Sequence, residues 1–500
     1  MASDRSPSSA QSGLVLTLDA GTSSVRCLAF DDQGNPHPAL HAAREHEPRS
    51  TPDGGSELDA SLLLRNSLDC LRETSTHAAA MGHALLAVGV CTFWHAFLAV
   101  ARDGTPLTPI YLWSDTRAAQ AAATLRGQLD QRAVHRRTGC VLHPSYLPAR
   151  LLWLRRQRPE LTAPGVRFLS FGEFLEQALF GSPRISVSMA SATGLFNQQT
   201  LDWDAEILAH LALTPESFAP LCREHAPVCG MRRPHADDLP ALRNVPFYPA
   251  LGDGACSNLG SGATRPGLAA LMIGTSAAVR LFFAEGGPPA PSGLWRYLLD
   301  GRQSLIGGAL SNGGNLIAWL QRSLRLPAPA RLEAELARAE PASHGLSMLP
   351  FLAGERNPDY PLEASGVLVG LKTATGPVQI VQAGMEAVAF RLAVLARLLR
   401  QVDPDLGGFV ASGGLLSSPA WLRILADVLG LPLMVSTVQE ASSRGAALMA
   451  LQGLGRIKSA SDLPAPVAER IEPDPARHSL YGEAMAEHER LYARFIQPGM

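Results

Sequence analysis

A short pattern that occurs twice constrains this chain more than any other feature of its sequence. Residues 18–30 read LDAGTSSVRCLAF, and residues 271–283 read LMIGTSAAVRLFF. Each copy predicts an apolar strand, a Gly-Thr-Ser turn and a second strand that begins with Val-Arg. Such a repeat predicts two related domains that each open with a hairpin. Backbone N–H groups and hydroxyls in the two turns are suitable donors for a polyphosphate held in a cleft between the domains.

The rest of the sequence fits a two-domain α/β protein. Its 500 residues exceed the size at which a single core usually stops growing. Strands at the start of the chain are followed by strands that alternate with helices, which is typical of mixed α/β layers. Prolines cluster at residues 226–250, so we expect domains over residues 13–250 and 251–500. We expect strands at 14–18, 26–30, 87–90 and 96–100, and helices at 59–73, 314–324, 377–401 and from 476 onward.

Composition excludes several classes of function. The formal net charge is −2, so the chain has no overall positive charge to attract a nucleic acid or an anionic membrane. The most apolar long stretch, 84–101, contains Trp94 and His95 and is better explained by two buried strands than by a membrane span. The seven cysteines form no CxxC pair, and the first residues lack the apolar core of a signal peptide. We therefore expect a cytoplasmic protein with neither a nucleic-acid nor a membrane partner.

The scarcity of lysine limits which types of phosphate-binding site this chain can contain. The chain contains only two lysines, Lys372 and Lys458, and neither completes the motif GxxxxGK[ST]. No GxGxxG run follows the strand at 14–18, so a Rossmann dinucleotide site is not predicted either. The sequence therefore favours two lysine-free hairpin turns that act together with magnesium.

Several residues allow both a functional and a structural interpretation. Asp253, between two glycines, is either a general base for phosphoryl transfer or an aspartate that stabilises a turn. Asp19, at the end of an apolar strand, either holds a cation through water or caps the strand. Asp115 and Arg117 either form an ion pair or line a substrate site. His95, between two apolar strands, is either a buried core residue or a ligand contact.

Several motifs resemble those of the FGGY carbohydrate kinases, a family of the actin-like ATPase superfamily. They are LDAGTSSVR, LWSDTR at 112–117, LPARLLWLRR at 147–156, GDGACSNLGSGA at 252–263, GVLVGLKTATGPVQIVQAGME at 366–386 and SGGLLSSPAWLRILADVLGLP at 412–432. The resemblance implies two ribonuclease-H-like α/β domains with a central cleft, ATP and Mg²⁺ as cofactors, and phosphorylation of a small sugar. It assigns the sugar site and first phosphate loop to residues 13–250. The catalytic aspartate, second phosphate loop and adenosine site are expected in residues 251–500.

The resemblance also implies roles for individual residues. Asp253 is the expected catalytic base, and Asp19 is expected to hold magnesium. The expected ATP-binding residues are Thr22, Ser23, Ser24, Arg26, Gly274, Thr275, Gly314, Gly414 and Ser418. The expected sugar-binding residues are Trp94, His95, Asp115, Arg117 and Asp253. Two structural alternatives stay open: Arg26 pairs with Asp31 or Asp32, and Gly413–Gly414 only forms a turn before a helix at Pro419.

Within the family, the likeness is strongest to gluconate kinases. It is carried by TGCVLHPSY at 138–146, MASATGLFNQQTLDWD at 189–204 and LSNGGNLIAWL at 310–320. We therefore expect ATP-dependent phosphorylation of D-gluconate at its terminal hydroxyl, with a ketopentose such as xylulose or ribulose, another sugar acid, or glycerol as alternatives. A substrate carboxylate needs a cationic partner, for which the candidates are His95, His143, Arg117 and Arg150.

A different class of function competes with the kinase interpretation. The chain could be a sugar sensor without catalysis or a non-kinase actin-like ATPase. Asp19 and Asp253 favour the kinase, because a pure sensor needs neither carboxylate. The expected partner is a small-molecule sugar or sugar acid, and a homodimer is left open.

Overall fold

The computed structural model describes residues 13–497, which form two compact units. Unit 1 contains the chain up to Ala122 together with Pro144–Gly260 and Ser442–Leu463. Unit 2 contains Ala123–His143, Ser261–Ala441 and the chain from Pro464. Our expected boundary at residue 250 divides the chain once, whereas these units are assembled from interleaved segments. Helix α2 (Ala119–Gln128) begins in unit 1 and ends in unit 2, and α14 (Ala441–Gly453) begins where the chain returns to unit 1.

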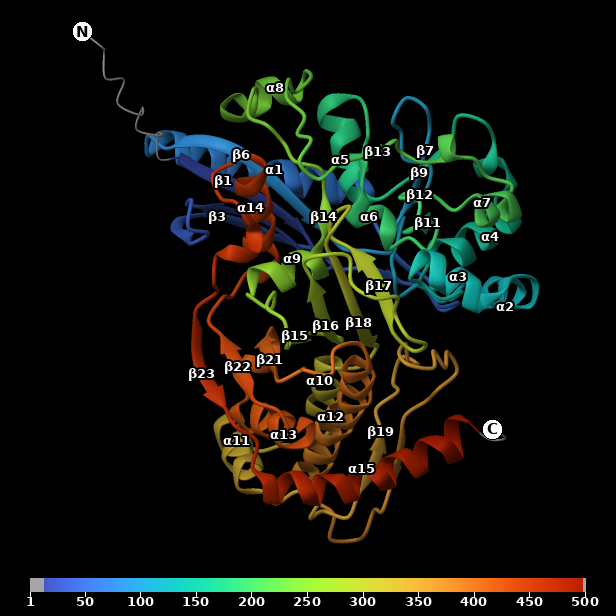
Figure 1. Cartoon of the computed structure of the whole chain (residues 1–500), viewed down its shortest axis with the longest axis vertical. Coiled ribbons are helices and arrows are strands. Elements are labelled where there is room, and N and C mark those ends of the chain that lie inside the picture. Colours follow the sequence, from blue (N-terminus) through green and yellow to red (C-terminus); the bar gives the residue numbers. More distant parts are fainter. Residues whose placement is uncertain (1–12, 498–500) are drawn as a thin grey trace. The chain divides into compact units, whose positions relative to one another are not determined.

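Unit 1 is built on a five-stranded sheet in the order β14-β6-β1-β2-β3 (Figure 1). The strands and helices of unit 1 are β1 (Gly13–Ala20), β2 (Ser24–Phe30), β3 (Pro36–Glu45), β4 (Arg49–Ser50), β5 (Ser56–Leu58), α1 (Ala60–Ala80), β6 (Ala84–Thr92), β7 (Leu98–Val100), β8 (Ile110–Tyr111), α4 (Leu147–Gln157), β9 (Arg167–Leu169), α5 (Phe171–Phe180), β10 (Ile185–Ser186), α6 (Val187–Ser191), β11 (Phe196–Asn197), β12 (Asp202–Trp203), α7 (Ala205–Leu211), β13 (Leu221–Cys222), α8 (His235–Asp238), β14 (Leu251–Gly252) and α9 (Asp253–Gly260). The expected strands at 14–18, 26–30, 87–90 and 96–100 are confirmed within three residues by β1, β2, β6 and β7.

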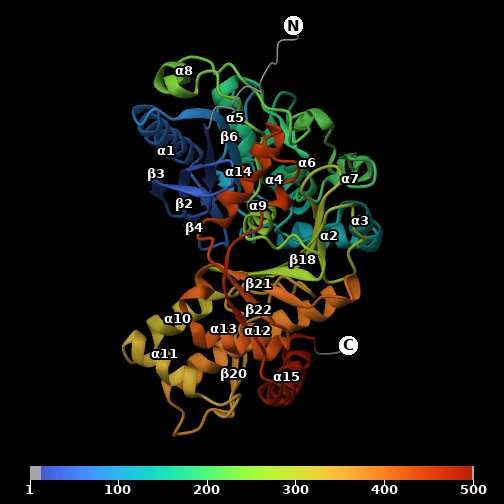
Figure 2. The same cartoon turned by 60° about the vertical axis from the view of Figure 1, so that its left-hand side comes forward.

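The arrangement around β1 explains why its sequence is so apolar. Every residue of β1 after Gly13 is buried, as expected for a central strand that is covered on both faces. Helix α1 lies against β2 and β3 (Figure 2). Its first turn is capped by Asp59, whose Oδ1 accepts a hydrogen bond from Leu62 N at 2.8 Å. The expected helix and its aspartate cap are confirmed, and the helix continues to Ala80.

Unit 2 is built on a seven-stranded sheet in the order β17-β18-β16-β15-β21-β22-β23. The strands and helices of unit 2 are α3 (Gln131–Thr138), β15 (Leu268–Ile273), β16 (Ala277–Phe283), β17 (Trp295–Leu298), β18 (Ser304–Leu310), α10 (Gly314–Ser323), α11 (Pro329–Arg338), β19 (Ser347–Leu349), β20 (Val367–Val369), α12 (Pro377–Val402), β21 (Gly408–Ser412), α13 (Pro419–Leu429), β22 (Leu433–Ser436), β23 (Val467–Ile471) and α15 (Pro475–Ile496). The expected helices at 314–324, 377–401 and from 476 are confirmed by α10, α12 and α15.

Helix α12 is the central helix of the unit 2 core. Within residues 13–497 it is the one helix long and apolar enough to cross a membrane, yet 78% of its most apolar window is buried in the protein. Val381, Val388 and Leu395 on this helix belong to the hydrophobic core that also includes strands β15, β16 and β21. Its length and composition are therefore explained by packing against the sheet.

The two sheets share one topology. In unit 1, β1 is antiparallel to β2, β2 is antiparallel to β3, and β1, β6 and β14 run parallel. In unit 2, β15 is antiparallel to β16, β16 is antiparallel to β18, and β15, β21 and β22 run parallel. The order β3-β2-β1-β6-β14 therefore repeats as β18-β16-β15-β21-β22. The repeat seen in the hairpin sequences extends to the whole sheet.

Candidate functional site

The turn between β1 and β2 is the first of the two predicted phosphate loops. Gly21 N donates a hydrogen bond to Ser24 O at 2.9 Å, which leaves Thr22 and Ser23 at the tip of the turn. His46, directly after β3, supports this turn: its backbone N donates to Ser23 O at 3.0 Å and its Nε2 donates to Gly21 O at 3.1 Å. Sequence reasoning missed His46, because the contact depends on the pairing of β2 with β3 and no local pattern marks it.

Asp19 lies at the end of β1, next to this turn, and is 9% exposed. Its Oδ2 accepts hydrogen bonds from Ser442 Oγ at 2.5 Å and Ser443 Oγ at 3.4 Å, both in the first turn of α14. Arg26 is directly opposite Asp19 in the sheet register. Figure 1 shows α14, drawn in red, beside the blue strands β1 and β6. The two serines were not among the sequence candidates, since Ser442 lies 423 residues from Asp19 along the chain.

The surroundings of Asp19 are compatible with the usual coordination of magnesium. Magnesium in phosphoryl-transfer sites is usually held by one or two carboxylates together with waters and substrate phosphates. The hydrogen bonds from Ser442 and Ser443 both go to Oδ2, and the role of Asp19 in holding magnesium stays a prediction. Among residues 13–497 no group of three or more His, Cys, Asp or Glu side chains could hold a metal ion by itself. A closed protein cage for a metal is therefore not part of this site.

Asp253, the predicted base, is the first residue of α9 and directly follows β14. Its Oδ1 accepts a hydrogen bond from Gly254 N at 2.7 Å. A Cβ atom at Gly252 would lie 1.8 Å from the indole ring of Trp94, so only glycine allows Trp94 to pack here. Trp94 Nε1 in turn donates to Ser188 O at 3.1 Å. The structure therefore brings Trp94, a predicted sugar contact, against the backbone immediately before Asp253.

His95, the next residue, has an unusual backbone and a well-defined side-chain environment. Its φ of 59° lies in the left-handed region that few residues other than glycine adopt. Its Nδ1 donates a hydrogen bond to Ala192 O at 2.7 Å, and its ring packs edge-on against Tyr146 at a centroid distance of 5.0 Å. The ring is partly exposed. Backbone strain held by surrounding contacts is a common property of functional residues.

Arg150 supports this segment from inside the unit. It is 1% exposed, and burial lowers its pKa to about 9. Its guanidinium donates to four backbone carbonyl oxygens, those of His95, Tyr111 at 3.2 Å, Leu112 at 2.9 Å and Ser145 at 2.6 Å. The residue that sequence analysis considered for a substrate carboxylate therefore already has protein acceptors.

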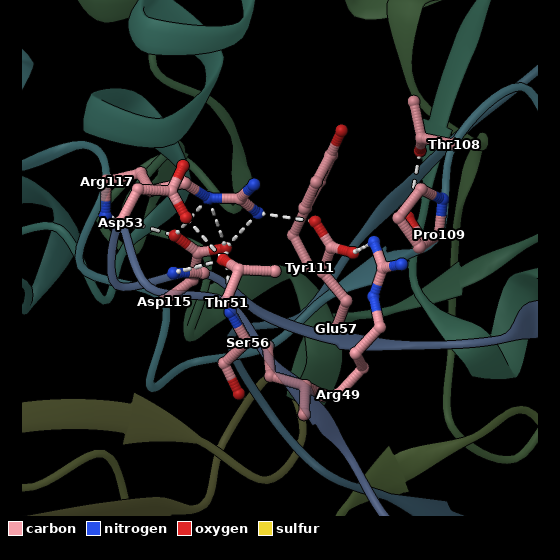
Figure 3. Close-up of polar contacts among 12 residues, drawn as sticks. Arg49, Thr51, Asp53, Ser56, Glu57, Thr108, Pro109, Tyr111, Asp115 and Arg117 are labelled. Atoms are coloured by element: carbon pink, nitrogen blue, oxygen red, sulfur yellow. Dashed lines mark hydrogen bonds and ion pairs between the residues drawn. The ribbon is translucent and has the colours of Figure 1, made fainter.

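Arg117 is held in a network of ion pairs, which Figure 3 shows. Its Nη2 lies 2.5 Å from Asp115 Oδ2 and 2.8 Å from Glu57 Oε1. Burial acts to lower the pKa of Arg117, but hydrogen bonds and charge from Asp115 and Glu57 outweigh this and raise it above its usual value. The guanidinium also stacks over Trp153 at 4.8 Å. Of the two interpretations of Asp115 and Arg117, the ion pair is present.

The turn between β15 and β16 in unit 2 is the second predicted phosphate loop. Gly274 N donates to Ser276 O at 2.9 Å, and Thr275 at the tip is exposed. Gly314, the first residue of α10, packs against this turn: its N donates to Gly274 O at 2.8 Å, and a Cβ there would lie 2.5 Å from the same oxygen. Gly413, with φ of 85°, approaches from β21, where a Cβ would lie 2.8 Å from Ile273 O. The backbones of three glycine-containing turns therefore pack closely against one another here.

Gly414 and Ser418 follow Gly413 in the turn that leads to α13. Gly414 is exposed, and Ser418 caps α13 by accepting a hydrogen bond from Trp421 N at 3.2 Å. Ser418 Oγ also donates to Glu333 Oε2 at 2.9 Å, and Glu333 Oε1 accepts Ala420 N at 2.6 Å. The helix expected to begin at Pro419 is confirmed. The structural role of Ser418 is present, and its contact with ATP stays a prediction.

Comparisons with known proteins identify the relatives of this chain. Residues 14–260 match the N-terminal domain of the FGGY family of carbohydrate kinases, and residues 269–454 match its C-terminal domain. A gluconokinase of Bacillus subtilis (strain 168) is 26% identical over 463 residues, which cover 89% of this chain and 88% of that protein. A glycerol kinase of Citrifermentans bemidjiense is 29% identical over 457 residues, which cover 88% of this chain and 90% of that protein.

The same fold occurs in a solved structure. A gluconate kinase from Lactobacillus acidophilus matches with a TM-score of 0.89 at 22% identity, over 98% of this chain and 99% of that one. Together with the family match, this likeness confirms the expected pair of ribonuclease-H-like α/β domains.

Proposed function

Because this chain belongs to the FGGY family of carbohydrate kinases, we propose that it transfers the γ-phosphoryl group of ATP to the terminal hydroxyl of gluconate. The observation that carries the proposal is the placement of Asp253 at the start of α9, with Trp94 packed against the residue before it. The similarity to a gluconokinase along 89% of the chain supports gluconate as the substrate. Glycerol is the second candidate, because a glycerol kinase is similar over a comparable length.

In the proposed mechanism, Asp253 accepts the proton of the sugar hydroxyl as its oxygen attacks the γ-phosphorus. Gly254 N already donates to Oδ1 of Asp253, which fixes the orientation of the carboxylate. Trp94 provides an apolar wall that excludes water from the same position. Proton removal and water exclusion both favour transfer to the sugar over hydrolysis of ATP.

The two hairpin turns have the donors that phosphate oxygens require. The backbone N–H groups and hydroxyls of Thr22, Ser23 and Thr275 supply neutral hydrogen bonds, and Arg26 supplies a positive charge. Gly314 and Gly414 allow the backbone to approach the nucleotide closely. Magnesium, held near Asp19, would supply charge neutralisation for the phosphates when bound.

A substrate carboxylate needs a cationic or donor-rich partner. Arg150 is hydrogen-bonded to carbonyl groups, and Arg117 is ion-paired with two carboxylates. His95 and His143 stay in the proposal as candidates beside these two arginines. His143 is buried and packs against the ring of Tyr360 at 4.9 Å, whereas His95 is partly exposed.

The proposal also covers the cellular compartment and the binding partner of the enzyme. None of the seven cysteines, which all lie within residues 13–497, forms a disulfide bond, which fits a reducing cytoplasm. The proposed partner is a small-molecule sugar acid. A catalytically inactive sensor is disfavoured, because both carboxylates, Asp19 and Asp253, stand at strand ends with polar partners.

An ADP-release assay with magnesium-ATP tests the proposal across gluconate, glycerol, xylulose and ribulose. We expect kcat/KM for gluconate to exceed that for each of the others by at least about tenfold, or roughly 1.4 kcal/mol. Mass spectrometry of the product distinguishes phosphorylated sugar from ADP formed by hydrolysis. A higher kcat/KM for glycerol or a ketopentose would replace gluconate as the substrate. Failure to phosphorylate any sugar or polyol would overturn the kinase assignment itself.

A further inference from the structure

Residues 354–357, Gly-Glu-Arg-Asn, form a series of hydrogen bonds with the end of β18 and the residues after it. These contacts have no role in the mechanism proposed above. Asn357 Oδ1 accepts a hydrogen bond from Ala309 N at 2.9 Å. Arg356 Nη2 donates to Leu310 O at 3.1 Å, one residue further along β18. We call residues 354–357 the clamp segment.

The order continues beyond the strand. Glu355 Oε1 accepts a hydrogen bond from Ser311 N at 2.9 Å, and Asn312 Nδ2 donates to Gly354 O at 2.9 Å. Four consecutive residues, 309–312, thus each bond to one residue of the clamp segment in antiparallel order. Since β18 ends at Leu310, side chains here take the place of a neighbouring strand for backbone groups that would otherwise be unsatisfied.

The clamped residues lead directly into the second phosphate loop. Gly313 and Gly314 follow Asn312 and pack against the turn between β15 and β16. A Cβ at Gly313 would lie 2.7 Å from the carbonyl carbon of Ser276, and Gly314 N donates to Gly274 O at 2.8 Å. A shift of the clamped residues would therefore move the surface that supports this turn.

Glu355 occupies a costly position for a carboxyl group. It is 2% exposed, and burial raises its pKa to about 7. Its Oε2 is buried without a hydrogen-bond partner among residues 13–497, and the charge of Arg391 acts on it from α12. Arg391 is itself 2% exposed and lies over the ring of Tyr492 at 4.3 Å. An incompletely satisfied buried acid is destabilising and needs an explanation. The other oxygen, Oε1, accepts hydrogen bonds from both Ser311 N at 2.9 Å and Arg356 N at 2.8 Å, so it ties residue 311 to the clamp segment.

We propose that Glu355 is a positioning residue for nucleotide binding, which holds residues 311–314 so that the Gly274–Ser276 turn keeps the geometry that phosphate requires. This inference rests on the proposed function, because it assumes that ATP phosphates bind at this turn. Glu355 does not touch the nucleotide in this proposal. Its effect passes through Ser311 and the two glycines that follow.

The test compares Glu355→Ala with Glu355→Gln, using ADP binding by calorimetry and steady-state kinetics. We expect Glu355→Ala to weaken ADP binding and to raise KM for ATP by roughly tenfold, while KM for the sugar changes less than about twofold. Glu355→Gln keeps an acceptor for Ser311 N, so it should restore ADP binding to within about threefold of the wild type. If Glu355 were only structural, Glu355→Ala would not change the KM for ATP more than the KM for the sugar. Glu355→Gln would then not restore ADP binding selectively.

Two further variants make the experiment decisive. Glu386→Gln is the matched control: this buried carboxylate in the same unit accepts Ala342 N at 3.1 Å and should leave KM for ATP within twofold. Asn312→Ala removes the other end of the clamp and carries the same test if Glu355→Ala does not fold. Unchanged ADP affinity in folded Glu355→Ala or Asn312→Ala overturns the positioning role. If the wild type binds neither ADP nor ATP, the proposed kinase function fails instead.

Discussion

The β1–β2 turn of unit 1 and the β15–β16 turn of unit 2 stand at the same place in two sheets of one topology, but they differ in charge. Asp19 ends β1 beside its turn, whereas Met272 takes that place in the second copy. The strand that corresponds to β14 is β22, and it is followed by Thr437 where β14 is followed by Asp253. At these two pairs of corresponding positions the carboxylates are both in unit 1, and unit 2 has Met272 and Thr437 instead.

The arginine that both copies share also differs in position. Arg26 is opposite Asp19, whereas Arg280 is opposite Ala270, two residues further from the turn than Met272. The second copy has one more residue between its glycine and its arginine, and the pairing shifts accordingly. Arg280 is consequently buried at 4% exposure, while Arg26 is partly exposed. The two copies thus share one sheet topology, whereas Asp19 and Asp253 have no acidic counterpart at the corresponding places in unit 2.

The largest effect should come from Asp253→Asn. This change keeps the shape of the side chain and removes the base, so turnover should fall by at least roughly a thousandfold with little change in substrate affinity. Phosphorylated sugar must be measured together with ADP, because slow hydrolysis of ATP could persist. If Asp253→Asn still phosphorylates the substrate at near wild-type rate, Asp253 is not the base and does not distinguish unit 1 from unit 2 chemically. Asp115 would then become the next candidate base.

A matched pair of changes tests the difference between the two turns directly. Asp19→Asn should lower kcat about a hundredfold and raise the magnesium concentration needed for half-maximal activity, because the carboxylate beside the phosphates is lost. Met272→Leu, at the corresponding place in unit 2, should change kcat by less than about twofold. Titration of activity with magnesium measures both. Equal losses in the two variants would contradict the division of charge between the units.

Removing the hydroxyl at the tip of either turn should have an intermediate effect. Thr22→Val and Thr275→Val each remove one hydrogen bond to a charged phosphate, which corresponds to roughly a tenfold increase in KM for ATP. The dissociation constant of the sugar, measured without nucleotide, should stay within about twofold. Loss of sugar binding in either folded variant would show that the turns do not act on the nucleotide alone.

Glu173 in unit 1 and Glu355 in unit 2 are buried glutamic acids whose contributions to stability can be compared. Burial raises the pKa of both Glu173 and Glu355 to about 7. The unfolded chain releases this proton near pH 4.5 and the folded chain near pH 7, so each group makes the protein less stable as pH rises through this window. Relative to Glu173→Gln, the melting temperature of the wild type should therefore fall between pH 4.5 and pH 7. A constant difference between the two proteins would contradict the buried neutral acid.

The smallest effect is expected for Lys372. The proposed second phosphate loop, the turn between β15 and β16, binds phosphate without a lysine. Lys372→Ala should therefore keep the affinity for ATP within about threefold. Lys372 is exposed, and its backbone N donates a hydrogen bond to Thr375 Oγ1 at 2.9 Å. Nucleotide titration by calorimetry measures the effect. A loss beyond about a hundredfold, or roughly 2.7 kcal/mol, would mean that unit 2 does contribute a charge.

The fold could be predicted from the sequence because its signals are local. The hairpins, the cap at Asp59 and the long apolar helix α12 all follow from patterns within a few residues. The interactions that complete the site are not local. Ser442 reaches Asp19 and Glu333 reaches Ser418 across parts of the chain that no periodicity connects. The protein acceptors of Arg117 and Arg150 are also distant in sequence or hidden by burial, and a contact of either guanidinium group with the sugar stays a prediction.

The return of the chain to unit 1 at Ser442 has a consequence for how the protein is made. Gly445 in α14 packs so closely on α9 that a Cβ would lie 1.9 Å from Cys256 O, and Gly89 packs in the same way on Ala446. On the ribosome, strands β1, β6 and β14 emerge long before the helix that covers them. Unit 1 is therefore complete only when synthesis has passed residue 463, the end of its last segment. A nascent chain that ended before Ser442 would lack the helix that packs on α9 and β6, next to the strand that carries Asp19.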